Sequence, residues 1–203
     1  MIEMIPVVTN GYFIVKTEND EKNISLEKYG YWLFQWSIDE ARASLEVLND
    51  EKYNFSPLVE GFRANSFWAQ AQFIAIYVAS YWFYADEFQS VPMDGQRRMK
   101  IGMDDAIKQL EGVNPSQIQY LRGSISAYLQ ANIEDFNYSK NLEQGVFRPD
   151  ISKLASKFFE LTLPLYPNLK ITEIDRTLLG FFVTDMPLQI YNALHELQIR
   201  YVK

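Results

Sequence analysis

An uncharged run of about 22 residues, 64–85, constrains the fold more than any other part of this chain. The run is rich in alanine and in aromatic side chains. A helix that is apolar on every face belongs in the interior of a domain. Ala71, Ala75 and Ala79 recur every four residues, so they form one ridge that a second helix can approach closely. We therefore expect residues 67–88 to form the buried central helix of an all-helical domain.

The same run is long enough to span a lipid bilayer, so a membrane-associated protein built on residues 64–85 is one alternative. However, Gln70 and Gln72 lie inside the run, and Tyr77 would place a hydroxyl near the middle of the bilayer. No stretch rich in lysine or arginine flanks the run to fix its orientation. Burial within the protein explains these features more simply.

Composition narrows the classes of function. The 203 residues carry a net charge of -7, which disfavours a protein that tracks nucleic-acid phosphates. There are no cysteines, so disulfides, thiolate zinc sites and cysteine nucleophiles are excluded. The first residues lack the basic and apolar regions of a secretion signal, and we expect a cytoplasmic protein. Hydrophobic residues make up 48% of the chain, enough for one core, so residues 1–203 are expected to form a single domain.

A short β-hairpin is predicted near the N-terminus. Two β-prone runs, 5–9 and 12–16, flank Asn10-Gly11, the pair that a two-residue type I′ turn prefers because both positions need positive φ. The polar residues 17–23 that follow are predicted to form a loop.

The aromatic-rich segment Leu26–Trp36 is compatible with a helix or a strand, because Gly30 interrupts it and its periodicity does not decide. As a strand, it would give the hairpin a third partner. In either case, residues 1–36 are expected to pack on the helical domain, since an isolated hairpin is barely stable in water.

Capping motifs and prolines divide the remaining sequence into helices. A Ser, Thr or Asn followed three residues later by an acid or glutamine can exchange hydrogen bonds with the first-turn backbone, which predicts helix starts at Ser37, Asn114 and Thr172. Prolines predict further starts at Pro57, Pro149 and Pro187. In the helix that starts at Thr172, three apolar residues share one face: Ile174, Leu178 and Phe181. The predicted fold class is mainly α, a single-domain bundle of about seven helices around the central apolar helix.

No catalytic constellation can be assembled from the sequence. His195 is the single histidine, so the paired histidines of helical di-metal sites are missing, and we interpret it as a boundary side chain. Glycine-rich phosphate loops are also absent from the sequence. We therefore predict no catalytic residue, no metal site and no cofactor.

These exclusions favour a non-catalytic protein-interaction module, and specifically an immunity-type inhibitor that binds and neutralises a cognate bacterial toxin. Acidic side chains would steer the protein toward a basic partner, and aromatic anchors would supply affinity. The candidate partner-binding residues are Asp86, Glu87, Asp104, Asp105, Glu134, Asp135, Tyr31 and Trp32. Neither nucleic acid nor membrane is expected as a partner.

The alternative from another class is a helical enzyme or small-ligand binder with a pocket between helices. The polar groups expected in such a pocket are Arg63, Gln72, Tyr77 and His195.

Overall fold

The computed structural model describes residues 11–17, 20–49, 66–110, 112–140, 152–166 and 171–203. This part of the chain is mainly helical, as predicted, with α1 (Leu26–Asn49), α3 (Ser66–Phe83), α4 (Met93–Lys108), α5 (Pro115–Lys140), α6 (Lys153–Thr162) and α7 (Glu173–Glu196). A π-helical turn, η2 (Tyr84–Phe88), continues α3, and a short 3-10 turn, η4 (Leu163–Leu165), follows α6. Three strands complete the fold: β1 (Tyr12–Thr17), β2 (Asp20–Ser25) and β3 (Arg200–Val202).

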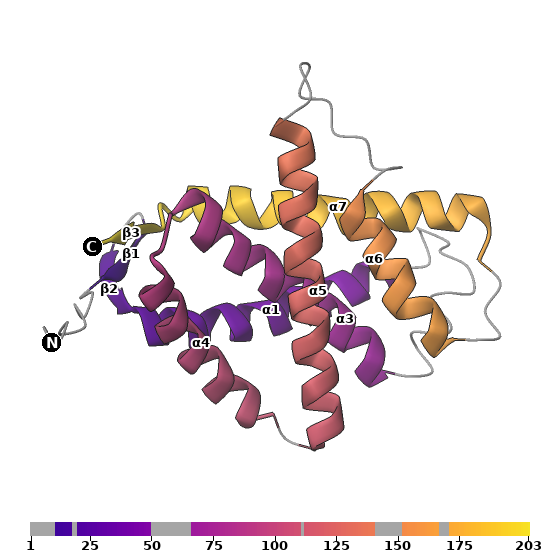
Figure 1. Ribbon diagram of the computed structural model, residues 1–203, viewed down its shortest axis with the longest axis horizontal. Coiled ribbons are helices and arrows are strands. Elements are labelled where there is room, and N and C mark those ends of the chain that lie inside the picture. Colours follow the sequence, from indigo (N-terminus) through magenta and orange to yellow (C-terminus); the bar gives the residue numbers. More distant parts are fainter. Residues whose placement is uncertain (1–10, 18–19, 50–65, 111, 141–151, 167–170) are drawn as a thin grey trace, which may run out of the picture.

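Helix α3 occupies most of the uncharged run. The alanine ridge is buried at Ala71, Ala75 and Ala79, and α3 contacts α1, α5 and α7. Small side chains permit these close approaches, because ridges of one helix fit into grooves of the next. In Figure 1, α5 crosses in front of α3, and α7 runs along the long axis behind α5. Among the described helices, none has both the length and the apolar character needed to cross a membrane.

Helix α1 begins at Leu26, so the segment 26–36 is helical and the helix start predicted at Ser37 is wrong. Ser37 is buried in the middle of the helix, and its Oγ donates a hydrogen bond to the Leu33 carbonyl at 2.6 Å. This back-bond satisfies the hydroxyl without ending the helix. The Ser-x-x-Glu pattern therefore occurs here inside a helix instead of at its N-terminus.

Two glycines set the distance between α1 and α4. A Cβ on Gly30 would meet the carbonyl of Met99, and a Cβ on Gly102 would meet the carbonyl of Glu27. The absence of both side chains lets the two backbones touch. Beside this contact, Arg98 donates two hydrogen bonds to the Glu27 carboxylate, at 2.6 and 2.9 Å.

The three strands form one antiparallel sheet in the order β2-β1-β3. Tyr12 in the middle strand pairs with Ser25 in β2 and with Val202 in β3. The C-terminal strand thus lies against the N-terminal one, at one end of the long axis (Figure 1). Hydrogen bonds from the Tyr201 amide to Gln89 and from the Tyr84 hydroxyl to the Ile199 carbonyl tie this end of the sheet to the π-helical region.

Strand β1 forms a hairpin with β2, which follows it in the chain. The strand predicted over 12–16 is β1, whereas 5–9 and Asn10 lie outside the described residues. The loop predicted over 17–23 is wrong, because β2 occupies most of it. Five of the six residues of β2 are exposed and only Ile24 is buried, so the strand has no apolar alternation that would reveal it in the sequence.

The helix start at Thr172 is confirmed by a complete capping box with Asp175, in which both backbone-to-side-chain hydrogen bonds measure 3.1 Å. The start at Asn114 is confirmed in the same way, by reciprocal hydrogen bonds with Gln117. The start predicted at Pro187 is wrong, because this proline lies inside α7. The helices predicted to start at Pro57 and Pro149 fall at residues outside the described part.

Candidate functional site

Three of the four residues expected in a polar pocket lie in the described part of the structure, and these three have separate partners. The Gln72 side chain is buried and hydrogen-bonded to the hydroxyls of Tyr120 and Tyr128, both on α5. Burial raises the pKa of Tyr128 well above its ordinary value, so this network is uncharged. The Gln72 and Tyr128 side chains therefore form a buried, hydrogen-bonded contact between α3 and α5.

Tyr77 and His195 have partners on other helices than Gln72 does: Tyr77 contacts α1, and His195 contacts a neighbour on its own helix, α7. The Tyr77 hydroxyl lies 2.6 Å from the Ser44 hydroxyl on α1. Burial raises the pKa of Tyr77, and the hydrogen bond to Ser44 opposes that shift. His195 is exposed on α7, with its ring stacked on Tyr191 at 5.9 Å between centroids. Arg63 lies outside the described residues. Gln72, Tyr77 and His195 thus lie in three different contacts. The described residues contain no cluster of three or more potential metal ligands.

Two of the candidate partner-binding acids on α4 are ion-paired within the chain. Asp104 accepts a hydrogen bond from Arg122 on α5 at 2.7 Å, and Asp105 accepts one from Lys108 at 2.9 Å. Both pairs are at least partly exposed, so each contributes little to stability.

Asp135 has a structural role at the N-terminus of α6. Its carboxylate accepts hydrogen bonds from the Ser152 hydroxyl at 2.8 Å and from the backbone amides of Lys153 and Leu154 at 2.7 and 3.0 Å. A carboxylate in this position satisfies first-turn donors and complements the helix dipole.

The other candidates differ in their exposure to solvent. Glu87 and Glu134 are exposed, and Asp86 is half-buried. Tyr31 is half-buried and donates to the Gln109 side chain at 2.8 Å. Trp32 is half-buried too, and the Lys28 ammonium lies 4.9 Å from its ring centroid. Whether these residues bind a partner stays a prediction.

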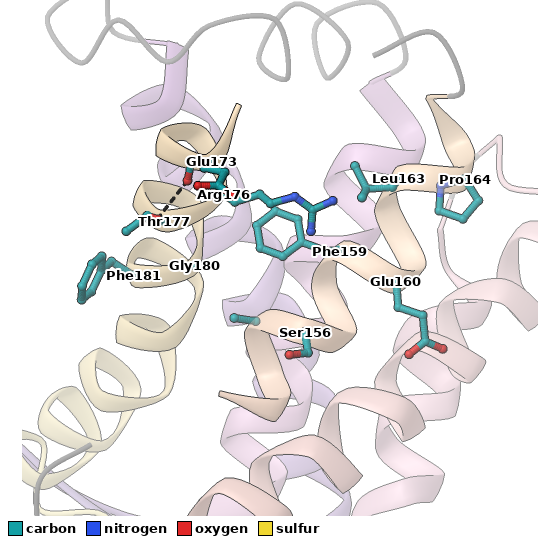
Figure 2. Close-up of a pocket in the computed structure, with 11 residues that line it drawn as sticks. Ser156, Phe159, Glu160, Leu163, Pro164, Glu173, Arg176, Thr177, Gly180 and Phe181 are labelled. Carbon is teal, nitrogen blue, oxygen red and sulfur yellow. Dashed lines mark hydrogen bonds between the residues drawn. The ribbon is translucent and has the colours of Figure 1, made fainter. Parts of the chain in front are cut away.

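A groove with a volume of about 970 Å³ lies between α6 and α7. Apolar side chains of α6 and η4 line one wall, among them Phe159, Leu163 and Pro164. Figure 2 shows Arg176 reaching from α7 toward Phe159 on α6. Its guanidinium carbon lies 5.3 Å from the Phe159 ring centroid, close enough for a cation–π contact.

Helix α7 has two apolar faces, and this is the feature that the sequence did not reveal. Its inner row packs in the core and consists of Leu179, Val183, Met186, Ile190 and Leu194. A second row faces solvent: Ile174, Leu178, Phe181 and Leu188 are exposed to 72%, 45%, 52% and 54%. We call this second row the α7 stripe. Ile174, Leu178 and Phe181 share one face as predicted, and that face lies outside the core.

Three charged residues of the described part line the groove: Glu160, Glu173 and Arg176. Helix α7 carries four carboxylates and one arginine, a net charge of -3 with histidine neutral: Glu173, Asp175, Asp185 and Glu196 against Arg176. Among the described residues, no carboxylate pairs with Arg176. The arginine side chain is therefore held against the Phe159 ring, in a groove that Glu160 and Glu173 also line.

Comparison with known proteins gave no match to any protein family, curated protein or solved structure.

Proposed function

We propose that this chain is a non-catalytic protein-interaction module that binds a basic, amphipathic helical segment of a partner protein on its α6–α7 face. The observation that carries the proposal is the α7 stripe. Large apolar side chains that recur on the outer face of a helix lower solubility unless another surface covers them. A groove of about 970 Å³ beside the stripe gives room for partner side chains.

The spacing of the stripe indicates the shape of its occupant. Ile174 and Leu188 are 14 residues apart, which corresponds to about 21 Å along a helix. A partner helix of about four turns would match that length, with apolar residues spaced i, i+4 and i+7 to face the stripe. Arg176 would then meet an acceptor on the partner, such as a carboxylate or a backbone carbonyl at the end of that helix.

Charge distinguishes a basic partner from a second copy of this chain. Two copies that met through the same stripe would bring together two chains of net charge -7. A basic segment gains from the same field, because opposite charges speed diffusional encounter and like charges oppose it. The basic partner is therefore the occupant that the observations favour.

An immunity-type inhibitor of a bacterial toxin is the specific form of this proposal, and it stays a prediction from composition. The exposed carboxylates Glu87 and Glu134 would act at long range in that case, while the stripe would supply the apolar contact.

The experiment uses a labelled synthetic helix of about 18 residues, with leucine on one face and lysine on the other, and the same peptide with glutamate in place of lysine. Binding to the full chain is measured by fluorescence anisotropy. We expect the lysine peptide to bind and the glutamate peptide to bind at least tenfold more weakly. The double variant Leu178→Ser/Phe181→Ser should lose at least a further tenfold, since each buried apolar side chain is worth about 1.5–3 kcal/mol.

A matched control removes two apolar residues of another helix that are at least as exposed as Leu178 and Phe181. Met93 and Ile101 on α4 are exposed to 67% and 55%. Met93→Ser/Ile101→Ser should bind the lysine peptide as the wild type does. Equal losses in both double variants, or equal binding of the two peptides, would refute the proposal. A wild-type dimer in sedimentation analysis that Leu178→Ser/Phe181→Ser dissociates would assign the stripe to self-association instead.

A further inference from the structure

A second hollow of about 400 Å³ lies where η2, α5, α7 and the start of α6 meet. We call it the aromatic cavity. Its walls are mainly aromatic and aliphatic, with Phe83, Tyr84, Phe88, Phe136, Leu188 and Tyr191 among them. Phe88 lies 5.5 Å from Phe136 and 4.9 Å from Tyr191 between ring centroids, so side chains from three elements converge here. This volume suits a small molecule and is too small for a protein segment.

The π-helical turn η2 contributes two of these aromatic walls, Tyr84 and Phe88. The Gln89 amide bonds back to the Tyr84 carbonyl at 3.1 Å, five residues away, which widens the helix. The chain then leaves the helix at Ser90, whose φ is 52°. π-turns cost stability and recur at functional sites, where they redirect side chains. Here the turn ends at Phe88, which remains 43% exposed beside the cavity.

A buried donor without a partner points to a ligand. Asn132 on α5 lines the cavity and is only 5% exposed, and its side-chain nitrogen has no hydrogen-bond partner among the described residues. The neighbouring carboxylate of Asp135 already accepts three hydrogen bonds from the start of α6. An unsatisfied buried amide is unfavourable, so an acceptor delivered by a ligand would remove a penalty that the free protein carries.

The lining also limits the charge of the ligand. The described residues that line the cavity include the Asp135 carboxylate and no lysine, arginine or histidine. An anion would enter next to a carboxylate without a countercharge, which is unfavourable in an apolar site. Flat rings pack well against edge-on and stacked aromatic walls.

We infer that the aromatic cavity binds an uncharged, planar aromatic molecule whose carbonyl accepts a hydrogen bond from Asn132. This site goes beyond the proposed protein interaction, because it takes a different class of ligand and shares only Leu188 with the α7 stripe. The α7 stripe residues Leu178 and Phe181 do not line it.

The test compares three probes of similar size: benzamide, which is neutral and has a carbonyl; benzoate, which is its anionic counterpart; and toluene, which lacks an acceptor. Each is titrated into the full chain and followed by ¹H–¹⁵N NMR. We expect saturable shifts at residues around the cavity, with benzamide binding at least tenfold more tightly than the other two. No partner peptide is present, so the outcome does not depend on the proposed interaction.

Two substitutions locate the site. Asn132→Leu removes the donor at similar volume, and it should weaken benzamide about tenfold while leaving toluene unchanged. Thr184→Phe should fill the cavity and abolish binding of all three probes. If Asn132→Leu does not fold, Asn132→Asp removes the donor and adds charge while keeping the shape, and it should also lose benzamide.

Met93→Ser/Ile101→Ser serves as the unaffected control. Absence of saturable binding to the wild type, toluene binding as tight as benzamide, or unchanged benzamide binding without the Asn132 donor would overturn the inference.

Discussion

The close contact between α1 and α4 predicts that the same substitution, glycine to alanine, has opposite effects at two positions. Gly102 lies in α4 with no room for a methyl group, because that group would overlap the Glu27 carbonyl. Gly123 lies in α5, is exposed, and has no atom within 4 Å of an added Cβ. Alanine is a better helix former than glycine by about 1 kcal/mol, so both changes receive the same intrinsic gain.

Packing decides the difference between the two variants. Overfilling a close-packed contact costs about 1–3 kcal/mol, and the upper end applies at Gly102 because its neighbour is backbone that cannot rotate away. Subtracting the helix gain leaves Gly102→Ala destabilised by about 2 kcal/mol, whereas Gly123→Ala is stabilised by about 1 kcal/mol.

Urea unfolding followed by circular dichroism measures both effects. With a denaturant slope of about 2 kcal/mol per molar, the midpoint falls by about 1 M for Gly102→Ala and rises by about 0.5 M for Gly123→Ala. Midpoints that shift in the same direction for both variants would refute the reasoning, since only the contact with α1 distinguishes them.

Three further predictions concern other contacts. Tyr128→Phe leaves the buried Gln72 amide without one partner, and we expect it to lower the free energy of unfolding by about 1–3 kcal/mol in urea melts. Asp135→Ala removes the carboxylate that caps α6, and a loss of about 1 kcal/mol is expected by the same assay, together with faster amide exchange in the first turn of α6. Hydrogen bonding from Arg98 lowers the pKa of Glu27 from its ordinary value of 4.5. Because the folded pKa lies below the unfolded one, this pair stabilises the fold above pH 4.5 and its contribution is lost as the pH falls through the folded value. Thermal melts between about pH 6 and pH 3 should therefore show a smaller acid-induced loss of stability in Arg98→Met than in the wild type, and equal losses would contradict the assignment.

Signals confined to a few neighbouring residues predicted local structure correctly. Asn114 with Gln117 and Thr172 with Asp175 mark helix starts because their hydrogen bonds span one turn. Sequence reasoning failed where the cause is distant. Gly30 looks like an interruption until the Met99 backbone on α4 occupies the space beside it.

The candidate site could not be predicted for a related reason. When a helix has two apolar rows, periodicity alone does not show which row the core covers, and the row predicted at Ile174, Leu178 and Phe181 proved to be the exposed one. Asn132 gave no signal at all, because a single asparagine in a helix becomes informative only when its surroundings are known to lack an acceptor.

The pairing of β1 with β3 has a consequence for biosynthesis. All the described helices separate these two strands in the chain, so β1 emerges from the ribosome long before its second neighbour exists. Until then it presents an open row of amides and carbonyls that other nascent chains can pair with. Translation that stops before Arg200 would leave that row permanently unprotected, and such fragments should aggregate even where their helices have folded.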